Sequence, residues 1–388
     1  MAKVVVTGGS GFIGSHVVDV LMEAGHDVTV IDHRIRPHRS DARFEDVDLM
    51  DLSSVLAATR GAEHIFHLAA VSNVNYAFKY PVYTATLNVV GTANILEAAR
   101  LNGAQRFYLA STVWVYNGSP NGHGVDETAP FYLNGAGHIY TSTKMASEMV
   151  CHNYGELYGV PFTVLRYGIP YGPRMREELL IPVFIKKALA GESLTVTGKG
   201  DQYRKFVYVR DMAEAHLLAM KGVAANQTYN LEGPRKVTVL EVAEGIRSAV
   251  GNGVRIEFVP ARPGDFRGKD VSGEKARREL GWVPRVDFEE GIRLTVDWFR
   301  QRLKAVARQR AERRQTSTRS RDRVSSMPDA NPRPPSRPSG LTTHARPSPF
   351  QIASKSARDS TILGASGSRR PAASVGARPS TISSGTGA

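Results

Sequence analysis

A tyrosine and a lysine, Tyr140 and Lys144, stand four residues apart in a segment predicted to be helical. Four residues make about one helical turn, so both side chains project from the same face. A neighbouring ammonium group stabilises a phenolate and would lower the pKa of the Tyr140 phenol towards neutrality. Such a phenol can act as a general base on an alcohol. Because this spacing is common, an ordinary pair on the surface of a helix is the alternative.

A hydroxyl group is predicted to lie beside this pair. Ser111 and Thr112 follow the apolar run 106–110, which is predicted to be a strand. In an open parallel sheet, ligands bind outside the carboxyl ends of the strands. A hydroxyl at that edge, a phenol and an ammonium on the next helix, and a dinucleotide nearby would together suit hydride transfer between an alcohol and a ketone.

The first sixteen residues predict where the dinucleotide binds. The β-branched run 3–7 is followed by Gly8, Gly11 and Gly14 and then by an amphipathic segment, a pattern typical of strand, tight turn and helix. Gly8 allows the turn, Gly11 lets backbone amides approach a diphosphate, and Gly14 lets the helix pack closely on the strand. The amino terminus of the helix then faces the negative charge.

Asp32 indicates which dinucleotide is bound. It ends the apolar run 28–31 and lies 18 residues after Gly14, close to the offset of about 20 residues at which an acid meets the adenosine ribose. A carboxylate there accepts from both ribose hydroxyls and repels a 2′-phosphate, so NAD is the expected cofactor. Arg34 and Arg36 follow closely and keep NADP open, because arginine is the usual partner of a 2′-phosphate.

The elements that must position these groups alternate along the first half of the chain. Strands are expected near Val4, Val28 and Ile65, at 106–110 and at 162–166, with helices from Phe12, over 83–101 and over 138–158. This alternation predicts an α/β fold with a doubly wound parallel Rossmann sheet. The Gly-, Asn- and Pro-rich loop 117–137 is unusually long for a compact domain, which indicates a lid or rim on the site.

Prolines interrupt the alternation after Arg166, and a smaller lobe is expected there. The predicted division is a Rossmann domain (1–168), a smaller substrate-binding lobe that returns some strands and helices to it (169–302), and a tail (303–388). The tail is rich in Arg, Ser and Pro and poor in large apolar residues, so it is expected to be disordered. A last helix is expected from Phe288 past Trp298.

Charge and cysteine content exclude several classes of function. Residues 301–388 hold 17 Lys and Arg against 4 Asp and Glu, whereas residues 1–300 hold 33 of each sign. A nucleic-acid contact is therefore conceivable only through the basic tail. The single cysteine, Cys151, excludes an intrachain disulfide and a cysteine-based zinc site and is expected in the core. His64 and His67 would point to opposite faces of a strand, so no metal site is expected.

The ends and the hydropathy of the chain predict its location. The first strand begins at Lys3, which leaves no room for a signal peptide. No uninterrupted apolar run reaches the length of about 18 residues that a membrane span requires. A cytoplasmic protein without a membrane span is therefore expected.

Further motifs resemble those of a known family. They are Thr-Gly-Gly-Ser-Gly-Phe-Ile-Gly-Ser-His (7–16), Asp48-Leu49, His67-Leu68-Ala69-Ala70, Asn88 before Gly91-Thr92, Val115-Tyr116, Tyr167, Tyr171-Gly172-Pro173-Arg174, Arg204 with Phe206-Val207-Tyr208-Val209, and Arg262-Pro263-Gly264-Asp265. With the tyrosine and lysine pair, they resemble the extended short-chain dehydrogenases/reductases of the NAD-dependent nucleotide-sugar epimerase/dehydratase family, above all its UDP-glucose 4-epimerases. The resemblance covers residues 3 to about 300.

The resemblance implies a role for individual positions. The resemblance implies that the cofactor's pyrophosphate contacts the backbone at Gly8, Gly11, Phe12, Ile13 and Gly14. It implies contacts of the adenosine ribose with Asp32 and of the adenine with Asp48 and Leu49. The middle of the cofactor would contact Leu68, Ala69 and Ala70, and its nicotinamide side would contact Asn88, Tyr140, Lys144 and Tyr167. Towards a nucleotide-sugar substrate it implies Thr112 at the reacting hydroxyl, Tyr140 as the base, and Arg204 and Arg262 at the diphosphate, which suits guanidinium geometry.

The two positions after Thr112 indicate which reaction of the family to expect. The resemblance implies Asp-Glu there in dehydratases and a Glu in decarboxylases, whereas Val113 and Trp114 cannot exchange protons. Tyr140 is then the one acid/base group, which suffices for hydride removal and return but not for elimination. The expected reaction is therefore epimerisation of a nucleotide-diphosphate sugar, of the UDP-glucose/UDP-galactose type, through a transient 4-keto sugar.

Two positions depart from the family pattern. Gly168 and Ile169 replace a Phe-Asn pair whose Asn normally bonds the substrate's diphosphate. Trp114 is larger than the residue that epimerases keep there, and it would either narrow the sugar pocket or pack beneath the loop 117–137. Two other functions thus stay open: an NAD(P)-dependent reductase or dehydrogenase of a non-sugar alcohol or ketone, and a non-catalytic dinucleotide-binding scaffold whose tail recruits a partner.

The resemblance also implies a homodimer. Relatives in this family form a four-helix contact through two helices, which correspond here to 83–101 and 138–158. Five apolar positions would serve this contact or would face the sheet instead: Val89, Ile95, Leu96, Met145 and Met149.

Overall fold

The computed structural model describes residues 1–119, 124–251, 253–260 and 269–325, with side chains described up to residue 309. The compact unit Met1–Arg323 contains every element described below except the last two residues of the final helix. Within the described ranges, no helix combines the length and the apolar character that crossing a membrane would require.

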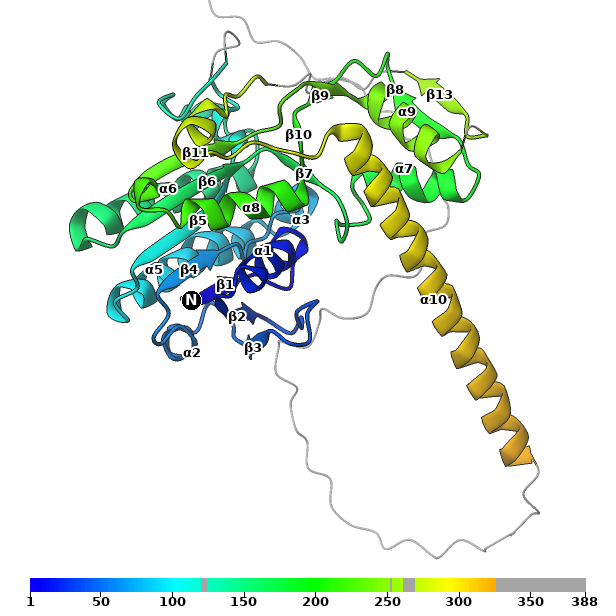
Figure 1. The fold of residues 1–388 in the computed structure, drawn as a ribbon, viewed down its shortest axis with the longest axis horizontal. Helices are drawn as coiled ribbons and strands as arrows, with labels where there is room; N and C mark the ends of the chain where they lie inside the picture. Colours follow the sequence, from blue (N-terminus) through cyan, green and yellow to red (C-terminus); the bar gives the residue numbers. More distant parts are fainter. Residues whose placement is uncertain (120–123, 252, 261–268, 326–388) are drawn as a thin grey trace, which may run out of the picture. The chain divides into compact units, whose positions relative to one another are not determined.

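A parallel sheet of seven strands organises this unit (Figure 1). Its strands are β1 (Lys3–Thr7), β2 (Asp27–Asp32), β3 (Arg43–Asp46), β4 (His64–His67), β5 (Arg106–Thr112), β6 (Phe162–Tyr167) and β11 (Gln227–Leu231). They follow the order β11-β6-β5-β4-β1-β2-β3, and all neighbours are parallel. The order reverses between β1 and β4, which is where sheets of this kind bind ligands.

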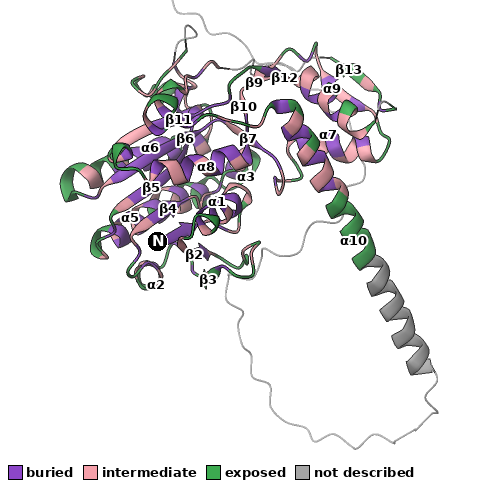
Figure 2. Ribbon diagram, in the orientation of Figure 1, coloured by how far each residue is buried: buried purple, intermediate pink, exposed green. Residues whose placement is uncertain are grey.

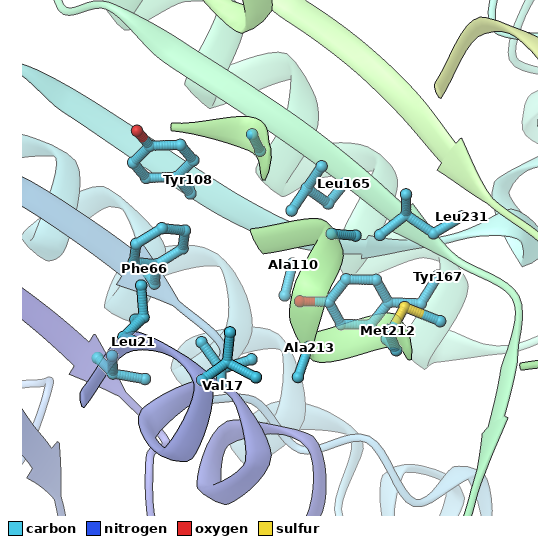
Figure 3. Packing of buried hydrophobic residues seen from close by; sticks show 14 of the residues in the cluster. Val17, Leu21, Phe66, Tyr108, Ala110, Leu165, Tyr167, Met212, Ala213 and Leu231 are labelled. Atoms are coloured by element: carbon cyan, nitrogen blue, oxygen red, sulfur yellow. The ribbon is translucent and has the colours of Figure 1, made fainter. Parts of the chain in front are cut away.

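Helices cover both faces of this sheet, so strand residues of both orientations are buried (Figure 2). α1 (Phe12–Glu23) and α8 (Val209–Ala219) cover one face, where Val17 and Met212 join a core with Phe66 (Figure 3). α2 (Leu52–Ala58), α5 (Gly91–Leu101) and α6 (Ile139–Tyr158) cover the other, with Cys151 in their core. The predicted doubly wound Rossmann sheet and the buried cysteine are confirmed.

A third core forms the smaller lobe. Its elements are β7 (Ile169–Tyr171), α7 (Leu180–Leu189), β8 (Leu194–Thr197), β9 (Tyr203–Arg204), β10 (Phe206–Tyr208), β12 (Val237–Thr238), α9 (Val239–Val250), β13 (Ile256–Val259) and the first turns of α10 (Phe288–Ser325). Small strand pairs β7·β10, β8·β13 and β9·β12 tie it together. Between them the chain returns to the main sheet through α8 and β11. The boundary after residue 168 stays a prediction.

Two elements differ from what the sequence predicts. The helix expected over 83–101 is built from α4 (Pro81–Ala85), a π-helical stretch η1 (Thr86–Val90) and α5. Helix α10 continues to Ser325, so residues 303–325, which the composition predicted to be disordered, are helical because Ala, Arg, Gln, Glu and Lys favour helices. The remaining tail, 326–388, lies outside the described residues.

Candidate active site

A cleft of about 630 Å³ opens at the reversal of the sheet, along the carboxyl ends of the strands. Most of the predicted site residues line it: Gly8, Gly11, Phe12, Ile13, Gly14, Asp32, Asp48, Leu49, Leu68, Ala69, Ala70, Thr112, Tyr140, Lys144 and Tyr167. The fold therefore brings the predicted glycine turn, the acidic residues and the catalytic trio to one place.

The glycine turn has the close contacts that its spacing predicts. Gly8 adopts φ +70°, and a Cβ atom there would lie 2.6 Å from the backbone nitrogen of Ala69. A Cβ atom on Gly14 would collide with the Gly8 carbonyl oxygen. Both positions accept only glycine, because the first strand, the turn and helix α1 meet there without room for side chains. The amino end of α1 thus stays open towards the cleft, which fits a bound diphosphate.

Asp32 is held in place at the end of β2 by two backbone amides. Ser10 N donates to Oδ2 at 3.1 Å, and His33 N donates to Oδ1 at 2.9 Å. Burial nevertheless raises the pKa of Asp32, since its desolvation outweighs these hydrogen bonds. Of the two arginines that kept NADP open, Arg36 places its guanidinium 5.5 Å from the centre of the Phe44 ring. Asp32 lines the cleft, whereas neither Arg34 nor Arg36 is among the residues that line it.

The predicted catalytic trio, Thr112, Tyr140 and Lys144, comes from two elements. Thr112 ends β5, and Tyr140 and Lys144 lie one turn apart near the start of α6. The helix begins there because the imidazole of His138 accepts from Thr141 N at 3.2 Å. The Thr112 hydroxyl hydrogen-bonds the Tyr140 phenol. The helix face that Tyr140 and Lys144 share, as the sequence predicts, thus points into the cleft.

The pKa of Tyr140 differs from the prediction. Burial raises it to about 12, and the charge of Arg176 and the hydrogen bond from Thr112 lower it only in part. Lys144 is 3% exposed, and its ammonium group donates to the Ala110 carbonyl at 2.8 Å. Burial lowers the pKa of Lys144 to about 8. The expected lowering of the tyrosine pKa by Lys144 is therefore wrong for this structure, because desolvation dominates at both groups.

Two other predicted residues, Asn88 and Arg204, do not line the cleft. Asn88 is buried and exchanges hydrogen bonds with the Val71 backbone at 2.7 and 3.0 Å and with Thr143 at 2.9 Å. These hydrogen bonds hold the segment after β4 in place, and the contact of Asn88 with the cofactor stays a prediction. Arg204 is not part of the cleft lining, and its Nη1 donates to the Tyr203 carbonyl at 2.6 Å. Arg262 lies outside the described residues.

Trp114 points into the cleft and also joins the packing beneath the loop 117–137. Its indole meets the ring of Tyr140 edge to face, with centroids 6.4 Å apart, and lies 4.9 Å from the ring of His138. Its other side packs on a small core that includes Phe131 of the loop. The sugar end of the cleft is therefore narrowed by an aromatic wall next to the predicted base. Residues 120–123 of the loop lie outside the described residues.

Acidic groups are confined to one end of the cleft. Among the described residues that line it, the carboxylates are Asp32 and Asp48. Asp32 is the last residue of β2, and Asp48 comes shortly after β3. Strand β5 and helix α6, which carry Thr112 and Tyr140, lie on the other side of the reversal. The lining near Tyr140 therefore offers a phenol and cations but, in the described part of the chain, no carboxylate.

A buried polar network beside the trio was not predicted. Glu148 accepts from the Ser111 hydroxyl and pairs with Arg166 at 2.6 Å, and both side chains are almost fully buried. Arg166 also donates to the Tyr116 hydroxyl, which donates in turn to Asn230 Oδ1 at 2.9 Å. Glu148 lies one further turn along the face of Tyr140 and Lys144, so the same spacing could have indicated it.

Several lining residues also escaped prediction. They carry no motif of their own and reach the cleft only through the folding of distant segments: Ile35, Ser72, Tyr83, Leu87, Pro170, Arg176 and Leu179. Arg176 matters most, because its charge acts on Tyr140.

Several known proteins are similar to this chain. The family model described as "NAD dependent epimerase/dehydratase family" matches residues 4–231. UDP-glucuronic acid decarboxylase 1 of Xenopus tropicalis is 34% identical over 314 residues, 79% of this chain and 74% of that protein. A putative UDP-glucose 4-epimerase of Methanocaldococcus jannaschii is 33% identical over 305 residues, 76% of this chain and 98% of that protein. The structure of a UDP-glucose 4-epimerase of Thermus thermophilus in complex with NAD is 35% identical with a TM-score of 0.69, covering 77% of this chain and 99% of that one.

Proposed function

Because this chain belongs to the NAD-dependent epimerase/dehydratase family, we propose that it interconverts the C4 epimers of a UDP-sugar such as UDP-glucose. The observation that carries this proposal is the absence of a carboxylate from the described lining near Tyr140. Dehydration requires a further acid/base pair, and Val113 and Trp114 stand where the resemblance implies one. Epimerisation requires only a base, a hydroxyl partner and a cofactor.

NAD is the cofactor of this family, and the chain's own residues fit it. The glycine turn and the amino end of α1 would hold the diphosphate, and Asp32 would accept from the adenosine ribose. Leu68, Ala69 and Ala70 form the apolar wall between these points and the trio. When bound there, NAD accepts a hydride from the sugar carbon and returns it.

The trio supplies the proton transfers. Tyr140 in its phenolate form takes the proton of the C4 hydroxyl and becomes a phenol, and the Thr112 hydroxyl, which hydrogen-bonds Tyr140, steadies the phenolate before this step. The 4-keto sugar turns about its link to the diphosphate and presents its other face, and Tyr140 then returns the proton. Lys144 holds the strand end through Ala110 and keeps a positive charge at neutral pH.

Product analysis tests this proposal. The purified protein is incubated separately with UDP-glucose, UDP-glucuronic acid and dTDP-glucose, and the products are identified by NMR. We expect UDP-galactose from UDP-glucose, with no net change in nicotinamide absorbance. Release of carbon dioxide or formation of a 6-deoxy-4-keto sugar would contradict epimerisation. Net consumption of cofactor with a non-sugar ketone would favour the reductase alternative.

Asp32→Asn tests the cofactor end of the site. The substitution removes the charge that accepts from the ribose hydroxyls, so NAD affinity should fall by about 10-fold or more, the value of a hydrogen bond to a charged group. NADP affinity should rise, because the repulsion of the 2′-phosphate disappears. Titration of the apoprotein with both dinucleotides measures the change. Unaltered affinity for NAD would show that Asp32 does not contact the cofactor.

We also propose a homodimer formed through α4, η1 and α6. Of the five positions for which the sequence left open this contact or burial within the fold, Ile95, Leu96 and Met145 are buried inside the unit. Other apolar side chains are exposed on this side of the molecule: Phe78, Val82, Tyr83, Val90 and Met149. Exposed apolar patches of this kind mark protein contacts.

Met149→Glu should convert the dimer into a monomer, because a carboxylate cannot be buried unpaired in an apolar interface. Light scattering measures the mass, and circular dichroism checks the fold. Val223→Glu, at an equally exposed position of the turn 222–224, is the matched control and should leave the mass unchanged. A monomeric mass of the unaltered protein would contradict the proposal.

A further inference from the structure

Glu232 lies beside the wall of the cleft, at an edge that the reaction scheme does not use. It is the first residue after β11. The strand register pairs Thr112 with Tyr167 and Tyr167 with Leu231, so the carboxyl ends of β5, β6 and β11 stand side by side. Gly168 follows Tyr167 and lines the cleft. Glu232 is therefore the neighbour of a cleft residue across the strand pair.

The glycine at position 168 makes room for this side chain. A Cβ atom on Gly168 would lie 3.0 Å from Oε1 of Glu232 and 2.9 Å from the Leu231 carbonyl oxygen. Any larger residue at 168 would displace the carboxyl group, which thus lies directly against the backbone of the cleft wall. Ile169, the next residue of the same wall, brings no polar side chain.

The carboxyl group of Glu232 is not satisfied within the protein. The residue is 7% exposed, and its Oε2 has no hydrogen-bond partner among the described residues. A buried polar atom without a partner costs about 1–3 kcal/mol, so such atoms mark a function or a missing ligand. Lys205, whose charge acts on Glu232, pairs with Asp270 at 2.5 Å and donates to the Val271 carbonyl at 3.0 Å.

We propose that Glu232 binds the diphosphate of the substrate as a protonated carboxylic acid that donates a hydrogen bond to a phosphate oxygen. This inference rests on the proposed function. Two strand spacings, about 10 Å, separate β5 from β11. Glu232 is thus too far from Thr112 to exchange protons with the reacting carbon, whereas a hexosyl diphosphate whose C4 hydroxyl meets Thr112 extends that far.

The protonation state agrees with this role. Burial raises the pKa of Glu232 to about 8, the charge of Asp270 raises it further, and Lys205 and the Gly233 amide oppose the rise. Lys205 and Asp270 are the charged groups that act on it, and Lys236 pairs with the far side of Asp270 at 3.2 Å. At neutral pH the acid form predominates and can donate. Above this pKa the carboxylate would repel a diphosphate.

Calorimetric titration of the NAD-loaded protein with UDP tests the proposal at about pH 7 and about pH 9.5, on either side of the raised pKa. The phosphate of UDP is ionised at both values, since its last pKa is about 6. UDP affinity of the unaltered protein should fall by about 10-fold or more at the higher pH, because the neutral fraction drops by that factor. In Glu232→Gln, whose amide donates at every pH, most of this fall should disappear.

Two further variants complete the test. Glu232→Ala should bind UDP weakly at both pH values, since it has no donor. Glu127→Gln removes another half-buried carboxylate of raised pKa, one that already accepts from Asn230 N at 2.7 Å, and should keep the pH profile of the unaltered protein.

The proposal is overturned if the UDP affinity of Glu232→Gln falls as steeply with rising pH as that of the unaltered protein. It is also overturned if Glu232→Ala binds UDP as tightly as the unaltered protein does. Because Gln has the shape of Glu, the comparison of Glu232→Gln with the unaltered protein tests the proposal even if Glu232→Ala does not fold. UDP carries no sugar, so the result does not depend on turnover. A protein that binds UDP in this pH-dependent way but does not epimerise UDP-glucose would overturn the proposed function and leave Glu232 in its role.

Discussion

Tyr140→Phe should lower kcat for UDP-glucose epimerisation by about 10²- to 10⁴-fold, the usual contribution of a general acid/base group. The substitution removes only the phenolic oxygen, which hydrogen-bonds Thr112. The ring that meets Trp114 edge to face at 6.4 Å remains, so the shape of the cleft is kept. Initial rates of product formation measure the effect, and the content of bound NAD should stay unchanged.

Tyr158→Phe is the matched control for this experiment. Tyr158 ends the same helix, α6, but its side chain is exposed and does not line the cleft. Its loss of a hydroxyl should leave the epimerisation rate close to that of the unaltered protein. If Tyr140→Phe instead retained most of the rate, the base would have to be another group, and the account of the trio would be wrong.

Glu148→Ala should lower the free energy of unfolding by about 3–5 kcal/mol, the cost of leaving one member of a buried ion pair without its partner. Arg166 lies 2.6 Å from Glu148, and its side chain is 6% exposed, so water cannot replace the lost carboxylate. The hydroxyl of Ser111 would also lose its acceptor. Urea unfolding followed by circular dichroism measures the change.

Glu274→Ala is the exposed counterpart of this substitution. Glu274 pairs with Arg277 at 2.7 Å, but both side chains are more than half exposed. Removing this pair should leave the free energy of unfolding nearly unchanged, as is usual at surfaces. An equally small change in Glu148→Ala would show that the buried network contributes little to stability.

The parts of the site that were predictable from sequence depend on short spacings. Gly8, Gly14 and Asp32 belong to one strand, turn, helix and strand unit, and the turn between β1 and α1 has the geometry that these spacings require. The separation of Tyr140 from Lys144 places both on one face of α6, as expected. Spacing alone predicted these features because the residues in each contact are separated by only a few positions or by one crossover connection.

Other features depend on the whole fold. The strand β3 has the sequence Arg-Phe-Glu-Asp and sits at the sheet edge, so it lacks the apolar run that would predict it. The raised pKa of Tyr140 follows from burial by segments distant in sequence, which no spacing reveals. The contact of Gly168 with Glu232 joins residues on two strands that become neighbours only in the sheet.

The relatives differ in the reaction that their names give, which makes the positions after Thr112 important. The chain is about as similar to a UDP-glucuronic acid decarboxylase as to a putative UDP-glucose 4-epimerase, at 34% and 33% identity. Overall similarity therefore does not select the reaction. The two residues after Thr112 offer no acid/base group, since Val113 is a buried apolar side chain and Trp114 turns its ring towards Tyr140.

The most direct test of the account follows the hydrogen on C4 of the sugar. The NAD-loaded protein is incubated with UDP-glucose that carries deuterium at C4, and the sugar nucleotides are analysed by NMR and mass spectrometry. Reversible oxidation with Tyr140 as the base predicts that UDP-galactose forms with deuterium still on C4. Failure to form UDP-galactose, or its formation with the deuterium replaced by solvent hydrogen, would contradict the account.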